Sequence, residues 1–187
     1  MHRQFYNCLK SSTTKMAFVD GRAGTMKTYI AVYAALEMIY DSLYDKLIYI
    51  RSVAESAEKS LGSLPGEVDD KFLPYAMPLL EKVQEITNNS TSNMLRQRGV
   101  IEAIPVNFVR GLTFNKSIVI VDEAHKFRND TSNMYEKLQT ITKTDRRIPG
   151  SNGDTRKKVM LLSATPLNNH PADIENQIYL YLHHDHS

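Results

Sequence analysis

The 187-residue chain has no tryptophan and a single cysteine, Cys8. One cysteine excludes an intrachain disulfide and suits a reducing compartment, so we expect a cytoplasmic protein. We expect Cys8 to be a small buried side chain rather than a nucleophile. The apolar run at residues 30–40 is too short to cross a bilayer and is interrupted by Glu37, which predicts a protein without a membrane span.

An excess of charge of one sign is also lacking, because 23 basic residues oppose 21 acidic residues for a net charge of +2. The net charge therefore gives no indication of nucleic-acid binding. A surface that binds nucleic acid would have to be a local basic patch. A hydrophobic content of 42% is ordinary for a globular protein. The length is that of one domain with a sizeable core, so we expect residues 1–187 to form a single domain.

Glycine is scarce, with eight in the chain, yet two of them fall in the short stretch Gly-Arg-Ala-Gly-Thr-Met-Lys-Thr at residues 21–28. An apolar run at 16–19 precedes this stretch, and a helical pattern at 29–40 follows it. A strand, a glycine-bearing loop and a helix opening on Lys-Thr predict a phosphate cradle. Met26 stands where the pattern G-x-x-x-x-G-K-[ST] has its second glycine. A positive φ there would cost about 1–2 kcal/mol.

The loop supplies the candidate nucleotide contacts. Its backbone N–H groups would surround the phosphates, Lys27 would reach the β- and γ-phosphates, and the Thr28 hydroxyl would hold Mg²⁺. The alternative is a chance occurrence of these residues in a surface loop. The candidate binding residues are Gly21, Ala23, Gly24, Thr25, Met26, Lys27 and Thr28.

A second candidate site follows the apolar run at 117–121, where Asp122 and Glu123 come in succession. Asp122 would complete the Mg²⁺ shell with Thr28, and Glu123 would orient the attacking water or accept its proton. Lys27, Asp122 and Glu123 are thus the catalytic candidates. A small-molecule kinase needs no glutamate where the water sits, so the pair favours ATP hydrolysis. The alternative is an ordinary strand-to-helix turn.

Five further polar side chains are candidates. Ser163 and Thr165 follow an apolar run and would stand beside the Asp-Glu strand, where their hydroxyls would sense the γ-phosphate or bond the Asp122 and Glu123 carboxylates. A helix cap is the alternative for them. Arg110 and Arg51 are candidate positive charges near phosphate or nucleic acid, with solvated surface arginines as the alternative. Gln4 offers a donor and an acceptor to an adenine edge, unless it is a solvated helix residue.

The alternation of apolar runs with helical patterns predicts an α/β fold with a mostly parallel sheet. Residues 67–86 read as a helical stretch broken or kinked at Pro74 and Pro78. Residues 88–93 read as a polar linker, and residues 145–158 as a basic loop that faces solvent or a phosphate backbone. We expect helices at 3–9, 29–40, 130–143 and 171–182, and strands at 16–19, 47–50, 100–104, 117–121 and 159–162.

Residues 18–29, Phe-Val-Asp-Gly-Arg-Ala-Gly-Thr-Met-Lys-Thr-Tyr, resemble the P-loop of PhoH-like proteins, especially the phage members. The segments Ile-Arg-Ser at 50–52, Gly-Ser-Leu-Pro-Gly at 62–66 and Val-Arg-Gly-Leu-Thr-Phe at 109–114 extend the resemblance over about residues 1–124. Members can carry a non-glycine residue at the Met26 position, whereas Arg22 stands where proline is usual. The resemblance implies an ATPase tied to RNA or DNA metabolism that can form rings.

Beyond Asp122, residues 122–129 and 162–169 look like motifs II and III of Swi/Snf-type superfamily-two helicases. A PhoH-like chain would have glutamine at His125 and a Gly-Asp sensor at Ser163-Ala164. Both families share a RecA-like P-loop core. We therefore expect a single RecA-like P-loop NTPase domain, with a seam between the family-like parts near 116–127. The combination of the two motif sets is compatible with a natural recombinant, an engineered chimera or a divergent family member.

Together these features predict a chain that binds ATP with Mg²⁺ and hydrolyses it, with RNA or single-stranded DNA as partner. A homo-oligomeric ring would let a neighbouring copy complete the site, for example through Arg110. Because helicases use a second RecA-like lobe, we do not expect an isolated copy to separate strands. The alternatives are a nucleotide-binding module or scaffold with negligible turnover and, less favoured, a small-molecule kinase.

Overall fold

The structure is a computed structural model that describes residues 2–51, 68–109, 112, 114–127, 157–164 and 175. The helix expected at 130–143, the PhoH-like segment at 62–66 and the expected basic loop up to residue 156 lie outside these residues. Of the helix expected at 171–182, Glu175 alone is described.

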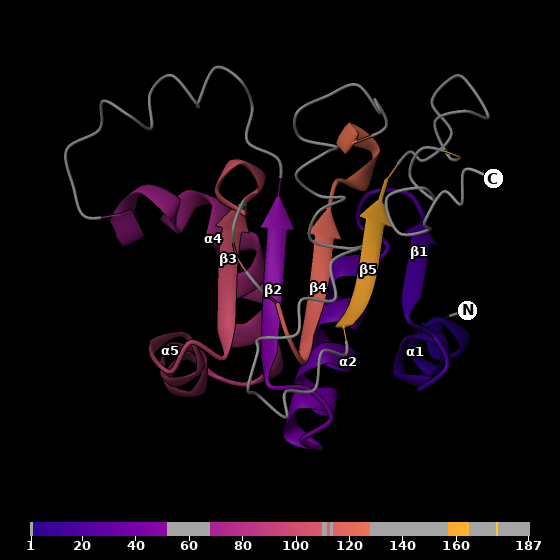
Figure 1. Ribbon diagram of the computed structural model, residues 1–187, viewed down its shortest axis with the longest axis horizontal. Coiled ribbons are helices and arrows are strands. Elements are labelled where there is room, and N and C mark those ends of the chain that lie inside the picture. The colour runs from indigo at the N-terminus through magenta and orange to yellow at the C-terminus, as the bar shows by residue number, and fades with distance from the viewer. Residues whose placement is uncertain are drawn as a thin grey trace.

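In the part of the chain that the structure describes, five parallel strands form one sheet in the order β1-β5-β4-β2-β3. The carboxyl ends of the strands therefore share one edge of the sheet, the upper edge in Figure 1. The predicted α/β fold with a parallel sheet is confirmed. Strands β1 and β2 are consecutive in sequence but are separated in the sheet by β5 and β4. The strands are β1 (Met16–Asp20), β2 (Lys46–Arg51), β3 (Ile101–Pro105), β4 (Ser117–Asp122) and β5 (Lys157–Ser163).

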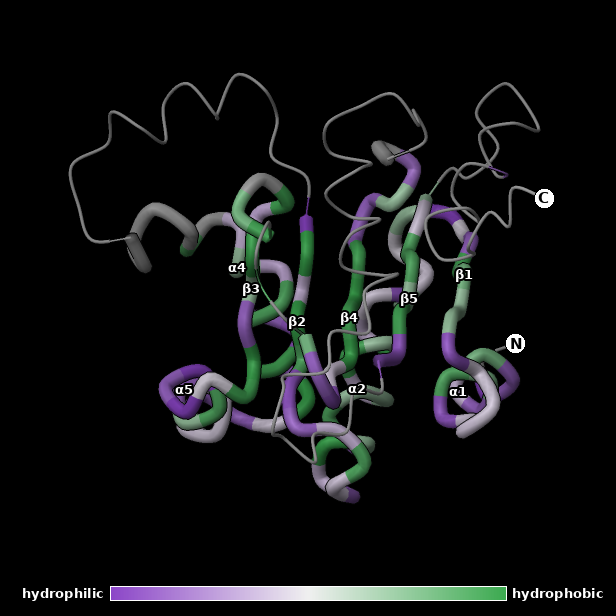
Figure 2. Tube along the Cα trace, viewed as in Figure 1, coloured by the Kyte–Doolittle hydropathy of each residue, from purple (hydrophilic) through white to green (hydrophobic). Residues whose placement is uncertain are grey.

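The central strands are apolar on both faces, as a sheet covered on both sides requires. In β4, five successive residues from Ser117 to Val121 are buried, and the runs in β2 and β5 are similar (Figure 2). One face, which includes Tyr49 and Ile120, packs against helices. The opposite face, which includes Val119 and Leu161, packs among the described residues against Val106, Val109, Phe114 and Ala124.

The helices on the first face position the start of the candidate site. Helix α2 (Lys27–Tyr40) follows β1 directly and buries Ala31, Ala34 and Met38 against the sheet. Helix α1 (His2–Lys10) packs on α2, where Tyr6 donates a hydrogen bond to Glu37. Helices α4 (Val68–Ile86) and α5 (Asn89–Gln97) precede β3, and two short 3-10 turns, η1 (Val106–Phe108) and η2 (Ala124–Phe127), follow β3 and β4.

Residues 67–86 were expected to be a helix broken or kinked at Pro74 and Pro78, and α4 is continuous, so the helix is not broken there. Each proline removes one backbone donor from the helix ladder. Leu79 and Val83 are fully buried against the sheet and α2, however, and burial of this kind supplies most helix stability in proteins. Tertiary packing therefore overrides the local signal.

Residues 88–93, expected as a polar linker, are the start of helix α5. The Asn88 side chain accepts a hydrogen bond from the Thr91 backbone N–H at 2.7 Å. Asparagine at this position is a preferred N-cap. The polar cluster therefore begins a helix instead of separating two elements.

Lys157 and Lys158, expected in the basic loop, instead open β5. Lys158 is buried, and its ammonium donates to the backbone oxygens of Leu9 and Ser11, each at 2.7 Å. Burial lowers the pKa of Lys158. The contact ties β5 to the carboxyl end of α1, where a cation is favourable. Cys8, expected to be buried, is exposed on α1.

None of the helices described in the structure combines the length and apolar character needed to cross a bilayer.

Candidate functional site

The loop between β1 and α2 has the backbone of a phosphate cradle. Gly24 and Met26 both adopt positive φ, at 80° and 61°. A Cβ added at Gly21 would lie 3.0 Å from Thr25 Oγ1, so a side chain there would crowd the loop. No side chain caps the start of α2, which leaves its first N–H groups for a ligand. Met26 therefore has the positive φ at which a non-glycine side chain is expected to cost about 1–2 kcal/mol.

Lys27 folds back over this loop. Its ammonium donates to the backbone oxygens of Gly21 and Arg22, the latter at 2.7 Å, and lies 3.4 Å from Thr25 Oγ1. Neutral carbonyls are weaker acceptors for a cation than phosphate oxygens are. The Lys27 amine is therefore held at the loop by contacts that an anionic ligand can replace.

A pocket of about 340 Å³ lies at the carboxyl edge of the sheet and joins the two predicted sites. The P-loop, the end of β4, the end of β5 and one turn of α4 contribute to its wall. Both sequence motifs thus reach the same cavity. Its lining residues are Ala23, Gly24, Thr25, Met26, Lys27, Thr28, Tyr29, Lys82, Glu85, Asp122, Glu123, Ser163 and Ala164.

Asp122 is the last residue of β4 and is half-buried. Its Oδ2 accepts a hydrogen bond from the hydroxyl of Tyr49, a fully buried side chain on the neighbouring strand β2. Burial, and next the Asp122 carboxylate, raise the pKa of Tyr49 well above its ordinary value. The Tyr49 hydroxyl therefore stays protonated and serves as a permanent donor.

Glu123 follows at a positive φ of 55°, which turns the chain sharply out of β4. His125 Nδ1 lies 3.3 Å from Glu123 Oε2 and 3.3 Å from Ser163 Oγ. The imidazole thus connects the end of β4 with the end of β5. The two strands are neighbours in the sheet, as the sequence predicted. The sequence had marked His125 only as a departure from a family pattern.

Two other candidates, Gln4 and Arg51, do not line the pocket. Gln4 is exposed on α1 and does not contribute to the pocket wall. Arg51 ends β2 directly opposite Asp122 in the strand register and is half-buried, and it too is absent from the wall. Arg110 and Thr165 lie outside the described residues.

Sequence reasoning missed the contribution of α4. Lys82 and Glu85 line the pocket, form an ion pair at 2.8 Å, and lie one helical turn apart. The hydrogen bond that the Lys82 ammonium donates to the Glu85 carboxylate raises the pKa of Lys82. Nothing in their local sequence marks them, because only the packing of α4 beside α2 brings them to the P-loop. Tyr49 carried a weak signal, since a tyrosine within a buried strand needs an acceptor for its hydroxyl.

The donor chemistry of the pocket suits Mg²⁺. Mg²⁺ is commonly held by one or two carboxylates, with substrate phosphates and water completing its shell. The Thr28 hydroxyl and the Asp122 carboxylate line the same cavity as the P-loop. Among the described residues, no group of three or more His, Cys, Asp or Glu side chains is arranged to hold a metal ion by itself.

Comparison with known sequences matches residues 1–143 to the family described as PhoH-like protein. This chain belongs to the PhoH-like protein family. The PhoH-like protein of Bacillus subtilis is 38% identical over 109 residues, which are 58% of this chain and 34% of that protein. The protein PhoH of Escherichia coli K12 is 35% identical over 119 residues, which are 62% of this chain and 33% of that protein. The match to this chain thus spans about a third of the length of these curated relatives.

Among solved structures, the SWI2/SNF2 ATPase core of Sulfolobus solfataricus in complex with dsDNA is similar with a TM-score of 0.60. Sequence identity is 10%, and the match covers 96% of this chain and 34% of that one. At this identity the likeness establishes the fold. The resemblance to PhoH-like proteins predicted from the sequence is confirmed, and this PhoH-like chain has the α/β fold of that ATPase core.

Proposed function

We propose that this PhoH-like chain binds ATP with Mg²⁺ at the P-loop and hydrolyses it. The observation that carries the proposal is the shared pocket, whose wall contains Lys27 and Thr28 from one motif and Asp122 and Glu123 from the other. Phosphoryl transfer to water requires positioned phosphates, charge neutralisation and an oriented water, and little covalent chemistry from the protein. These four side chains provide that set.

Each residue has a distinct task in this proposal. The N–H groups of the P-loop and the Lys27 ammonium bind the phosphates, and the amine exchanges its carbonyl partners for phosphate oxygens. Thr28 and Asp122 hold Mg²⁺, which neutralises phosphate charge when bound. Glu123 orients water and accepts its proton. Ser163 stands where it senses the γ-phosphate, linked to Glu123 through His125.

A nucleic-acid partner and a second copy of the chain belong to the same proposal. The SWI2/SNF2 core of the same fold was determined with dsDNA, and the sequence favours RNA or single-stranded DNA. A homo-oligomer would supply the arginine that stabilises charge in the transition state, for which Arg110 of a neighbouring copy is the candidate. Specific turnover that rises with protein concentration would support this assembly.

The decisive experiment measures ATP hydrolysis by the purified chain with and without single-stranded RNA or DNA. Lys27→Ala is expected to lower nucleotide affinity and turnover by about 100-fold, since a phosphate-contacting cation is lost. Glu123→Gln is expected to keep nucleotide binding and to lower turnover by about 10²–10⁴-fold, the usual contribution of a general base.

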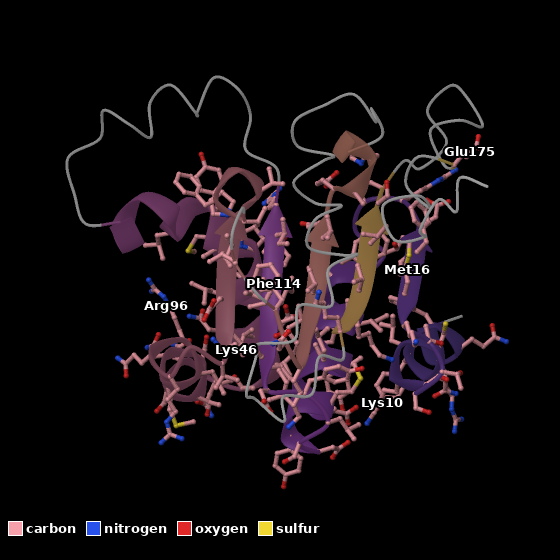
Figure 3. The ribbon with its side chains drawn as sticks, viewed as in Figure 1. Lys10, Met16, Lys46, Arg96, Phe114 and Glu175 are labelled. Atoms are coloured by element: carbon pink, nitrogen blue, oxygen red, sulfur yellow. The ribbon has the colours of Figure 1, made fainter. Side chains whose placement is uncertain are left out.

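Matched controls come from one exposed ion pair far from the pocket. Lys46, at the amino end of β2, lies 3.0 Å from Glu102 (Figure 3). Lys46→Ala and Glu102→Gln make the same lysine-to-alanine and glutamate-to-glutamine changes outside the pocket. They break an ion pair worth about 0–1 kcal/mol, so they are expected to leave turnover unchanged. If the controls reduce turnover as strongly as Lys27→Ala and Glu123→Gln do, the site assignment is wrong.

The second candidate function is a nucleotide-binding module with negligible turnover. The positive φ of Met26 favours it, because the loop carries a strained side chain where glycine is usual. Wild-type chain that binds ATP tightly, shows no hydrolysis and is unaffected by Glu123→Gln would establish this module in place of the ATPase.

A further inference from the structure

Tyr49 is the fully buried side chain that contacts the candidate cation site from inside the core. It lies in the hydrophobic cluster with Leu47 and Ile120, and its hydroxyl donates to Asp122 Oδ2. A tyrosine in this position brings apolar area to the core, as phenylalanine would. Among the described residues, its hydroxyl adds one hydrogen bond, and that bond goes to a residue of the site.

The strand register explains how the contact arises. Tyr49 of β2 lies opposite Ile120 of β4, and Asp122 is two residues further along β4. Residues two apart in a strand share a face, so Tyr49, Ile120 and Asp122 lie on the same side of the sheet. Diagonal neighbours of this kind are within reach of an aromatic side chain. The Tyr49 ring therefore extends along the sheet toward its carboxyl edge.

The hydrogen bond restrains the carboxylate. The terminal torsion of an aspartate is broad, so a carboxylate without a fixed donor samples many orientations. An ionised carboxylate only accepts hydrogen bonds, which makes the Tyr49 hydroxyl the donor. A bond to an ionised acceptor is stronger than a neutral one. Tyr49 takes one of the two lone-pair sites of Oδ2, so we assign the cation to Oδ1, the Asp122 oxygen outside this bond.

We propose that Tyr49 is a positioning residue for the Mg²⁺ site, which holds the Asp122 carboxylate so that one oxygen is presented to the cation. This inference rests on the proposed binding of Mg²⁺ with nucleotide at the pocket. Partners that orient metal ligands in this way typically change metal affinity by about 10–100-fold when they are removed.

The test compares wild type with Tyr49→Phe, which removes one oxygen and keeps the ring. Binding of mant-ADP, a fluorescent ADP analogue, is measured in EDTA and across a Mg²⁺ titration. The Mg²⁺ concentration for half-maximal binding is expected to rise by about tenfold or more, while affinity in EDTA stays unchanged. Tyr40→Phe is the matched control, because Tyr40 is 89% exposed and outside the pocket wall.

A packing role and a positioning role give different results. A loss of affinity that is equal with and without Mg²⁺, or no change in either condition, overturns the positioning role. In an Asp122→Asn background, Tyr49→Phe should no longer change the Mg²⁺ requirement, and an undiminished effect there also overturns it. If the wild-type chain binds no mant-ADP, the proposed function and this inference both fail. If it binds mant-ADP but Tyr49→Phe does not change the Mg²⁺ requirement, only this inference fails.

A second measurement applies if Tyr49→Phe does not fold. 3-Fluorotyrosine is incorporated at position 49 of the full chain, with position 40 as the control, and fluorine NMR follows the ADP-bound protein. Addition of Mg²⁺ is expected to shift the resonance at 49 and to leave that at 40 in place. An unshifted resonance at 49 overturns the proposal.

Discussion

At the scale of single residues, the P-loop places a glycine and a methionine in the same region of backbone conformation. Gly24 and Met26 have φ of 80° and 61°. Glycine reaches this region freely, whereas a side chain adds about 1–2 kcal/mol of strain. Met26 is also 48% exposed, so burial of its side chain returns little of that cost. Replacing Met26 by glycine should therefore stabilise the fold, and replacing Gly24 by alanine should destabilise it.

Met26→Gly is expected to stabilise the fold by up to about 1 kcal/mol, after the added freedom of glycine in the unfolded chain is subtracted. For a chain of this length that corresponds to about 2–4 °C in Tm. Gly24→Ala is expected to destabilise by about 1–2 kcal/mol through backbone strain alone, since a Cβ there meets no atom within 4 Å. Thermal unfolding of both variants checks the signs.

Ala23→Gly is the matched control for these changes, because Ala23 is in the same loop and has no positive φ. It should lower Tm slightly, by adding freedom to the unfolded chain without relieving strain. A Met26→Gly variant that melts below wild type would show that the observed φ of Met26 carries no net strain.

At the scale of secondary-structure elements, two helices depend on interactions that differ in kind. Helix α4 contains two prolines and is held by burial of Leu79 and Val83 against the sheet and α2. Helix α5 has few buried residues and begins with a specific cap, in which Asn88 accepts the Thr91 N–H. At α4 the prolines predict a break that does not occur, because burial of the helix outweighs the loss of two backbone donors. The sequence misleads at α5 because asparagines occur both in linkers and at helix starts.

Asn88→Ala is expected to destabilise the fold by about 1 kcal/mol, the usual cost of losing an asparagine N-cap. Denaturant unfolding gives this difference, and hydrogen exchange should show faster exchange at the start of α5. Asn93→Ala, an exposed change inside the same helix, is the control and should have little effect, since alanine is a good helix former. Equal losses at 88 and 93 would rule out the cap as the cause.

At the scale of the whole molecule, the sheet joins distant parts of the sequence. Strand β5 pairs with β1 on one side and β4 on the other, and β4 lies between β5 and β2. The family match to residue 143 also runs past the seam considered at 116–127. A division at β4 would therefore cut the sheet at its centre. The arrangement favours one cooperative unit, which is our proposal for the domain organisation.

We expect a single calorimetric unfolding transition, with an enthalpy of about 130 kcal/mol from a typical 0.7 kcal/mol per residue. The calorimetric and van't Hoff enthalpies should agree, as for a two-state domain. Addition of ADP with Mg²⁺ should shift the whole transition upward, because ligand binding stabilises the native state. Two separable transitions would contradict the single domain and would support a structural seam.

The sequence by itself determined the elements whose signals are local. The runs at 16–19, 47–50 and 117–121 are continuously apolar and β-rich, and they became strands of a parallel sheet. The glycine-bearing loop before Lys27 and the carboxylates after β4 were also predictable, because the chemistry of a phosphate site requires those residue types at those spacings. The parallel sheet then places both motifs at one edge.

Only the tertiary structure decided the contacts between elements that are distant in the chain. Lys82 and Glu85 reach the pocket because α4 packs beside α2, and Lys158 is buried because β5 meets the end of α1. Tyr49 reaches Asp122 because β2 and β4 pair in one particular register. Local propensity and periodicity report on neighbours within a few residues. Strand order and register depend on the packing of the whole core, so these contacts follow from the fold alone.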